Sequence, residues 1–174
     1  MERVSGVGGE DAVGPGVAGV RSSGAGVSAD ATADGRVPVT LSIPAERDYV
    51  VLVRSAAGHL GVRAGFSMAE MGDWRLAVDE ACGLLLLPDE VDVIGEELDC
   101  VFRLGPAGLA LTVSAEARPG SKPQVGGFGW SLLAALVDDL QWAEEEGRVR
   151  VDIVKRAAGA GGPGPGGPAR AGVR

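Results

Sequence analysis

The chain has 174 residues, of which 45% are hydrophobic, and a formal net charge of −8 at pH 7. This length predicts one domain with a sizeable buried core. The acidic balance argues against a nucleic-acid surface, because such a surface needs clustered basic side chains that displace counterions from phosphates. The first 36 residues lack the apolar stretch of a signal peptide, and the apolar run Leu84–Leu87 is too short to span a bilayer. We therefore expect a cytoplasmic protein that binds neither nucleic acid nor membrane.

Glycine and charge are unevenly distributed along the chain. Of the 29 glycines, nine fall in residues 1–36 and seven in residues 157–174, two segments without hydrophobic periodicity. Such Gly/Ala/Ser/Pro-rich segments cannot bury enough apolar surface to offset the entropy of ordering, so both are predicted to be disordered tails. Residues 37–156 form the predicted folded domain. They hold 11 basic and 19 acidic side chains, and therefore the whole net charge.

The first half of this domain predicts a strand followed by two helices. Alternating apolar residues at 37–43 have the period of a half-buried strand. Pro44 is predicted to open the first helix, since its fixed φ suits a first helical turn. A capping box of Ser67 and Glu70 predicts the start of the second helix, and Pro88 predicts its end. The predicted buried faces comprise Val50, Val53, Ala57 and Leu60 in the first helix, and Met71, Trp74, Val78, Ala81 and Leu85 in the second.

The second half predicts more strands and one further helix. In chain order the pattern gives an acidic connector at 88–97, a hairpin of strands 98–104 and 109–113, a loop at 117–129, a helix at 130–142 and a strand at 149–153. The core face of that helix is predicted to comprise Leu133, Leu136, Val137 and Leu140. Helices that do not strictly alternate with strands are typical of α+β proteins. The expected fold is a two-layer α+β sandwich, with helices packed on one face of a mostly antiparallel mixed sheet.

Cysteine and histidine do not suggest a metal site. Cys82 and Cys100 lack the spacing of paired ligands and lie within apolar patterns, which favours two buried, reduced thiols. His59 is the only histidine and has no second ligand type nearby, so a surface or capping position near a helix end is favoured.

Four segments occur in a fixed order along the domain. They are Leu41–Ala45 ahead of the first helix, Arg75–Cys82 within the second, Glu116–Gly120 after a strand, and Gly127–Asp138 at the start of the third helix. In order and spacing they resemble the nucleotide-binding boxes of the anti-sigma-factor serine kinases, within the GHKL (Bergerat-fold, histidine kinase/HSP90-like) ATPase superfamily. The resemblance covers nearly all of residues 37–156. It implies a Bergerat-type fold and a site for ATP and magnesium.

The second segment reads RLAVDEAC, where the family usually reads L-A-V-x-E-A-C-x-N-A. Glu80 matches the family glutamate, which acts as general base or orients the attacking nucleophile. A residue four places further shares its helical face, and the family places there an Asn that binds the magnesium ion. Leu84 occupies that position here. An isobutyl group offers no lone pair to a cation that demands oxygen ligands, so the resemblance implies a degenerate metal site.

The third segment has also changed. Glu116 stands where the family has an aspartate that accepts a hydrogen bond from the adenine amino group, and it is one methylene longer. Arg118 replaces a glycine that lets the backbone approach the nucleotide, whereas Gly120 is retained. A solvated charge at a strand end is the favoured interpretation of Glu116.

In the fourth segment, Gly127 and Gly129 match the glycines at which backbone N–H groups of a helix N-terminus hold phosphate. Trp130 is bulkier than the usual Leu. Loop flexibility ahead of the helix is the slightly favoured interpretation of the two glycines. For Glu80, a retained role and an ordinary surface carboxylate stay equally open, and the run Leu84–Leu87 is most simply core.

Members of this family bind a sigma factor and are released by a STAS-domain anti-anti-sigma factor, which active members phosphorylate on serine. Phosphoryl transfer needs positioned phosphates and metal, whereas docking needs only the fold and its surface. We therefore predict a regulatory anti-sigma-factor-like protein that acts by protein–protein binding, with a sigma factor or a STAS-domain antagonist as its partner. No cofactor is expected, weak binding of ATP and Mg being the alternative.

Two other functions stay open. One is an active ATP-dependent serine/threonine kinase, because Glu80, Gly127 and Gly129 are retained. The other is an interaction module that forms a homodimer and regulates something unrelated to transcription. Nucleotide binding would separate the kinase from the others, and co-purification of a sigma factor would separate the anti-sigma-factor-like protein from the module.

Overall fold

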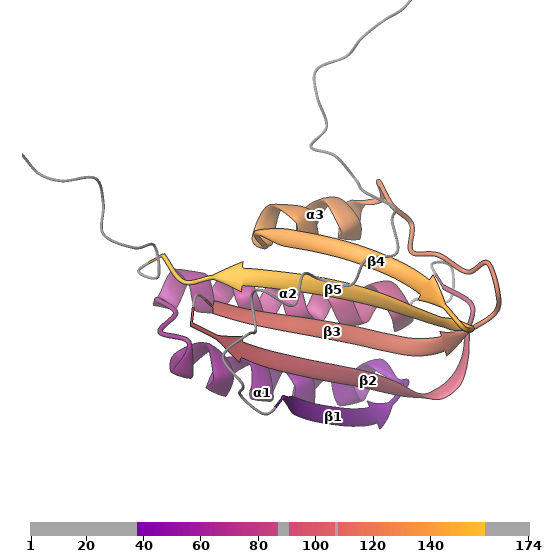
Figure 1. The fold of residues 1–174 in the computed structure, drawn as a ribbon, viewed down its shortest axis with the longest axis horizontal. Coiled ribbons are helices and arrows are strands. Elements are labelled where there is room, and N and C mark those ends of the chain that lie inside the picture. Colours follow the sequence, from indigo (N-terminus) through magenta and orange to yellow (C-terminus); the bar gives the residue numbers. More distant parts are fainter. Residues whose placement is uncertain (1–37, 87–90, 107, 159–174) are drawn as a thin grey trace, which may run out of the picture.

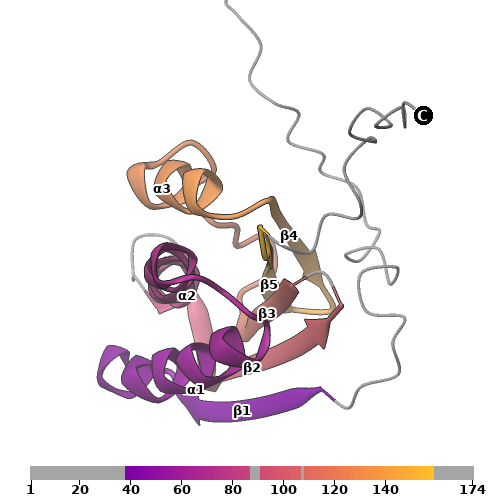
Figure 2. The same cartoon turned by 90° about the vertical axis from the view of Figure 1, so that its left-hand side faces the viewer.

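The computed structural model describes residues 38–86, 91–106 and 108–158. They form two layers, a five-stranded sheet and three helices that all lie on one of its faces (Figures 1 and 2). The elements are β1 (Val39–Pro44), a short 3-10 helix (Arg47–Tyr49), α1 (Val50–Arg63), α2 (Met68–Leu86), β2 (Val93–Gly105), β3 (Gly108–Ala117), α3 (Phe128–Leu136), β4 (Asp139–Glu145) and β5 (Arg148–Arg156). This confirms the predicted two-layer α+β class.

The sheet has the strand order β1-β2-β3-β5-β4, and every neighbouring pair is antiparallel. The prediction of a mixed sheet is therefore wrong in that one respect. The predicted hairpin is confirmed as β2 and β3, with Leu104 opposite Leu109. Alternate side chains of each strand face the helices, because successive residues of a strand point to opposite faces. The buried set on β2 and β3 is Leu98, Cys100, Phe102, Leu109, Leu111, Val113, Ala115 and Ala117.

The second helix begins as the sequence predicts. The backbone amide of Ser67 donates to Glu70 Oε2 at 2.7 Å, and the Glu70 amide donates to Ser67 Oγ at 3.3 Å. These two bonds are the capping box, and they satisfy donors that the helix itself cannot pair. The whole predicted stripe from Met71 to Leu85 is buried. The predicted stop at Pro88 lies outside the described residues.

Two predicted helix boundaries are wrong. Pro44 ends β1 instead of opening a helix, and α1 begins only at Val50, after the 3-10 turn. The predicted helix at 130–142 is divided, because α3 ends at Leu136 and Val137 is extended, with φ −122° and ψ 162°. The following residues form β4, which pairs with β5. Pairing with the exposed edge of β5 therefore outweighs the helical spacing of Leu136 and Leu140.

The domain also begins and ends slightly differently from the prediction. The acidic connector predicted at 88–97 is in part strand, since β2 starts at Val93. At the other end, the Ala158 amide donates to Glu70 Oε1 at 2.7 Å, two residues beyond the predicted limit at Arg156. The predicted tails lie outside the described residues, apart from residues 157 and 158. Within the described part of the chain, no helix is long and apolar enough to cross a membrane.

The two cysteines face each other across the layers, Cys82 from α2 and Cys100 from β2. Both are fully buried and neither forms a disulfide, so the prediction of two buried, free thiols is confirmed. A hydrogen bond with Cys100 and burial raise the pKa of the Cys82 thiol well above its usual range.

Candidate functional site

The predicted site residues on α2 and α3 lie against each other. Gly127 is the N-cap residue of α3, and the Ser131 amide donates to its carbonyl at 3.0 Å. Within the first turn of the helix, Gly129 faces α2 closely. A β-carbon placed on Gly129 would lie 3.4 Å from Glu80 Oε2 and 3.5 Å from Leu84 Cδ2. The structure thus brings together Glu80, Leu84 and the N-terminal turn of α3.

Glu80 is half-buried beside this turn. Its pKa is raised, chiefly because burial disfavours the charged carboxylate and secondly because Asp79 adds a like charge. The Arg47 guanidinium acts in the opposite direction and lowers the pKa. Glu80 thus places a carboxyl group beside the N-terminal turn of α3, where the helix dipole favours negative charge.

Leu84 closes the contact between the two helices. Its side chain is only 2% exposed, and it belongs to the same buried core as Trp130 and Leu133 of α3. Magnesium demands near-octahedral oxygen coordination, and an aliphatic side chain in a packed core offers no ligand. Within the described residues, no group of three His, Cys, Asp or Glu side chains could hold a metal ion. The residues present therefore do not fit the magnesium that the resemblance implies.

Glu116 and Gly120 are not part of this cluster. Glu116 lies between the buried residues Ala115 and Ala117 on β3, so it points to the sheet face opposite the helices, where it is exposed. It pairs in register with Arg148 of β5. Gly120 has a φ of +84° in the loop that follows, a conformation that favours glycine.

Arg118, which replaces a family glycine, points into solvent. Its Nε atom lies 2.6 Å from Asp92 Oδ2, and both side chains are largely exposed. An ion pair of this kind contributes little to stability. The Arg118–Asp92 pair links the loop after β3 to the residue just before β2.

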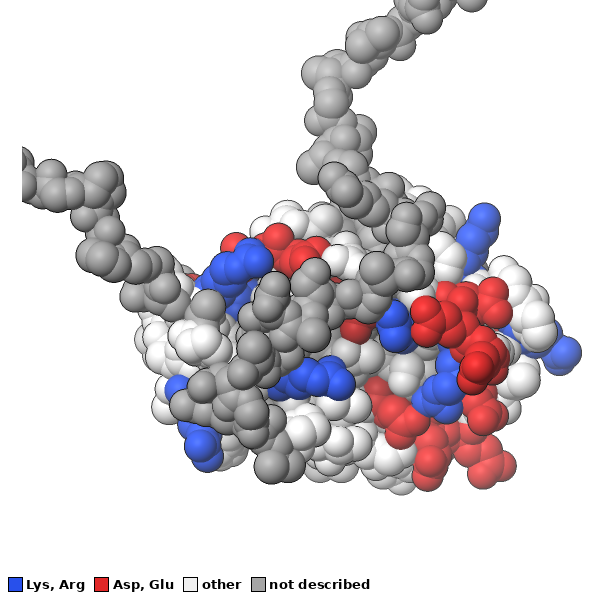
Figure 3. All heavy atoms as spheres, viewed as in Figure 1, with Lys and Arg blue, Asp and Glu red and all other residues white. Residues whose placement is uncertain are grey.

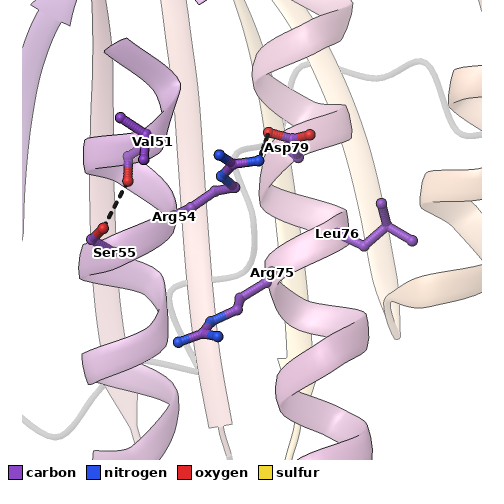
Figure 4. A pocket seen from close by; sticks show the side chains of 6 residues that line it. All are labelled: Val51, Arg54, Ser55, Arg75, Leu76 and Asp79. Atoms are coloured by element: carbon purple, nitrogen blue, oxygen red, sulfur yellow. Dashed lines mark hydrogen bonds and ion pairs between the residues drawn. The ribbon is translucent and has the colours of Figure 1, made fainter. Parts of the chain in front are cut away.

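Sequence reasoning missed a groove on the other side of α2, where that helix meets α1. Its volume is about 490 Å³, and Figure 4 shows two arginines reaching across it from opposite helices. Arg54 of α1 forms an ion pair with Asp79 of α2 at 3.3 Å. The full lining is Val51, Arg54, Ser55, Arg75, Leu76 and Asp79. One feature of the sequence could have indicated this groove. Gly58 lies on the buried face in the middle of α1, and a residue without a side chain leaves room there for Arg75.

Acidic side chains gather at one end of the sheet, seen on the right of Figure 3. This acidic end is defined by exposed glutamates from the start of β2, the end of β3, the end of β4 and the turn after it, namely Glu96, Glu97, Glu116, Glu144, Glu145 and Glu146. Arg148 and Arg150 lie among them. Arg148 pairs with Asp99 at 2.5 Å, whereas Arg150 pairs with Asp152 at 3.2 Å and with one of the six glutamates, Glu145, at 3.6 Å. The glutamates therefore keep an excess of negative charge.

Comparison with known proteins identifies similar chains. No family model matches. The serine-protein kinase RsbW of Bacillus mycoides (strain KBAB4) is 25% identical over 127 residues, covering 63% of this chain and 79% of that protein. The protein of the same name from Bacillus cereus (strain AH187) is 24% identical with the same coverage.

A solved structure has a similar fold. It contains the RsbU and RsbW domains of Rv1364c from Mycobacterium tuberculosis, and it matches with a TM-score of 0.55 and 14% identity over 70% of this chain. The present chain spans about a third of that longer one, since 32% of it is covered. The predicted resemblance to anti-sigma-factor serine kinases is confirmed.

Proposed function

From its similarity to the RsbW serine-protein kinases, we propose that this chain is an anti-sigma-factor-like regulator that acts by protein–protein binding in a partner-switching pathway. Its partners are a sigma factor, a STAS-domain anti-anti-sigma factor, or both. Phosphoryl transfer is impaired or lost. The observation that carries the proposal is the packing of Leu84 against the first turn of α3, where a kinase of this type needs oxygen ligands and room for phosphates.

The chemistry of phosphoryl transfer explains why one substitution matters so much. Catalysis depends almost entirely on the positioning of phosphates and on the neutralisation of their charge by metal. A retained Glu80 can accept a proton, but it cannot replace a bound cation. Docking of a protein partner requires only a folded surface of the right shape and charge, and Leu84 supports that fold as part of the core.

The acidic end of the sheet supports a partner with basic surfaces. Sigma factors bind DNA and therefore expose such surfaces, and complementary charge accelerates encounter more than it strengthens the final complex. We expect the association rate to fall several-fold as salt is raised, with dissociation nearly unchanged, because exposed charges are screened over about 8 Å at physiological ionic strength. Neutralising Glu144, Glu145 and Glu146 should reproduce part of that slowing, and a salt-independent association rate would contradict it.

Capture from a cell extract of the source bacterium tests the proposal directly. The tagged full-length chain is used as bait, retained proteins are identified by mass spectrometry, and each candidate is then purified and titrated against the bait. We expect a sigma factor or a STAS-domain protein that binds with a submicromolar dissociation constant. Retention of neither class would overturn the proposal and favour an interaction module unrelated to transcription.

An active serine/threonine kinase is the second candidate, because Glu80 keeps its place beside the N-terminal turn of α3. Calorimetry with millimolar Mg-ATP separates the two candidates. The proposed function predicts weak binding or none, with the same weak heat when EDTA replaces magnesium. A micromolar dissociation constant that depends on magnesium would favour the kinase.

A further inference from the structure

We propose that the groove between α1 and α2 binds an acidic, amphipathic helix of the protein partner. This inference rests on the proposed function, because it assigns a surface to the partner that the proposed function requires. It adds the place of contact and the chemistry of the segment that is held there.

The groove is long enough for a helix. A second hollow of about 320 Å³ shares Val51, Arg54 and Asp79 with the first and continues along the same two helices to Leu86. From Arg75 to Leu86 the rise along α2 is about 17 Å, which corresponds to about three helical turns. Two packed helices present such a groove to a third, and amphipathic helices recognised in this way are a common mode of protein–protein binding.

Arg75 supplies an unpaired positive charge within this groove. Its guanidinium lies across α1 at Gly58, where an added β-carbon would come within 2.6 Å of Nη2. In Figure 4 the side chain points toward α1 and away from Asp79. Among the described residues it makes no hydrogen bond or ion pair, since Asp79 pairs with Arg54 instead. A planar, unpaired guanidinium is suited to a carboxylate, which it binds in a bidentate manner.

The charge of the groove is opposite to that of the domain. Its two hollows are lined by three arginines, Arg47, Arg54 and Arg75, and by two aspartates, Asp48 and Asp79. The lining therefore carries one net positive charge, whereas the chain as a whole carries −8. A carboxylate on the partner would meet attraction here and repulsion at the acidic end of the sheet, so charge selects the groove over that end.

Apolar side chains on both walls fit the rest of an amphipathic helix. Val51 of α1 is 47% exposed and Leu76 of α2 is 41% exposed, and both line the groove. Burial of such side chains provides the main favourable free energy of binding, while the charged pair fixes orientation. The groove thus combines an apolar surface with one unpaired cation.

Charge reversal at Arg75 tests the inference with the partner identified by capture. We expect Arg75→Glu to weaken binding at least about tenfold, as is typical when a charged contact at the centre of an interface is reversed. Val51→Asp should weaken it to a similar extent. Arg63→Glu and Val62→Asp are matched controls, because both residues are exposed on α1 and neither lines the groove. Each control should change affinity less than about twofold, and thermal melts confirm that all four variants fold.

The outcomes separate this inference from the proposed function. If no sigma factor or STAS-domain protein is captured, the proposed function fails. If one is captured but groove and control variants bind it equally well, the groove is not the contact and only the further inference fails. A charge reversal on the partner, Glu→Arg or Asp→Arg at the residue that contacts Arg75, should restore binding to the Arg75→Glu variant. If no such substitution among the partner's acidic residues restores binding, the further inference is also overturned.

Discussion

Helix α2 makes two contacts with its neighbouring helices, and they differ in chemistry. Toward α3 the contact is closed, with Leu84, Trp130 and Leu133 buried and Gly129 in close approach. Toward α1 it is partly open, and charged side chains line the groove that remains. The closed side is where the family resemblance places a nucleotide, whereas the open side has no counterpart in that resemblance.

The difference shows how one substitution can change the use of a helix. An Asn at position 84 would leave polar atoms that require a cation or water, whereas Leu84 needs only carbon neighbours. We propose that the packed side contributes to stability and does not bind a nucleotide. The surface left for recognition is then the side that remains open, and the following predictions test this division.

The largest effect is expected at the closed contact. Leu84→Ala should lower the free energy of unfolding by about 3 kcal/mol, because it removes buried methyl groups and leaves a cavity between α2 and α3. Leu52→Ala is the control, because Leu52 is half exposed on α1, and a change below about 1 kcal/mol is expected there. Urea denaturation measures both. A cost at Leu84 no greater than at Leu52 would show that the contact is not closed.

Two glycine substitutions test the same contact between α2 and α3, with smaller expected changes in the free energy of unfolding. Gly129→Ala should be neutral or stabilising by up to about 1 kcal/mol, since its β-carbon would make ordinary contacts at 3.4 and 3.5 Å and alanine favours a helix. Gly127→Ala should cost about 1 kcal/mol, because its β-carbon would lie 2.8 Å from Gln124 Oε1 and 3.2 Å from the Gln124 carbonyl oxygen. Thermal melts measure the stability of both variants. A Gly127→Ala variant more stable than the Gly129→Ala variant would contradict the described packing.

Both contacts depend on where α2 begins, and Glu70 sets that position. Hydrogen bonds from Ser67, and from the amide of Ala158, lower the pKa of Glu70 to about 2. An unfolded glutamate titrates near about 4.3, so Glu70 stabilises the fold above that pH and loses its contribution as the pH falls toward 2. Glu70→Gln should lower the melting temperature at pH 7 and have progressively less effect between about pH 4.3 and pH 2. An effect independent of pH would show that the carboxylate charge is not involved.

The smallest effect is expected from shortening the chain. Residues 37–158 should melt within a few degrees of the full chain, which for a domain of this size corresponds to about 1 kcal/mol. Residues 37–156 should melt slightly lower, because they lack the Ala158 amide that donates to Glu70. A larger fall for residues 37–158 would show that a predicted tail contacts the domain.

Much of the fold could be predicted because it depends on local patterns. The bonds between Ser67 and Glu70 span three residues, and a hairpin such as β2–β3 joins neighbours in sequence, so both are visible in a short window. The end of α3 before Val137 was not visible in such a window. It depends on the pairing of β4 with the edge of β5, a strand that comes later in the chain. Long-range pairing outweighs local helical spacing in such cases.

The candidate site was predictable only in part for a similar reason. Leu84 could be recognised as a missing ligand from its spacing to Glu80, and the structure shows the two on the same side of α2, facing Gly129. Glu116 is exposed near the end of β3, which agrees with the favoured interpretation of a solvated charge at a strand end. The groove escaped prediction, because it depends on the distance between two helices and on the side chain of Arg75 lying over Gly58.

The facing thiols of Cys82 and Cys100 give this protein an intrinsic probe of its own breathing. Both sulfurs are sealed between α2 and β2, so a thiol-specific dye can label them only during moments when the two layers separate. The labelling rate therefore reports the free energy of that opening without any introduced label. A bound partner that clamps α1 and α2 together would slow the reaction, and a weakened contact at α3 would accelerate it. One colourimetric trace per variant could rank every substitution described above by its effect on the same motion.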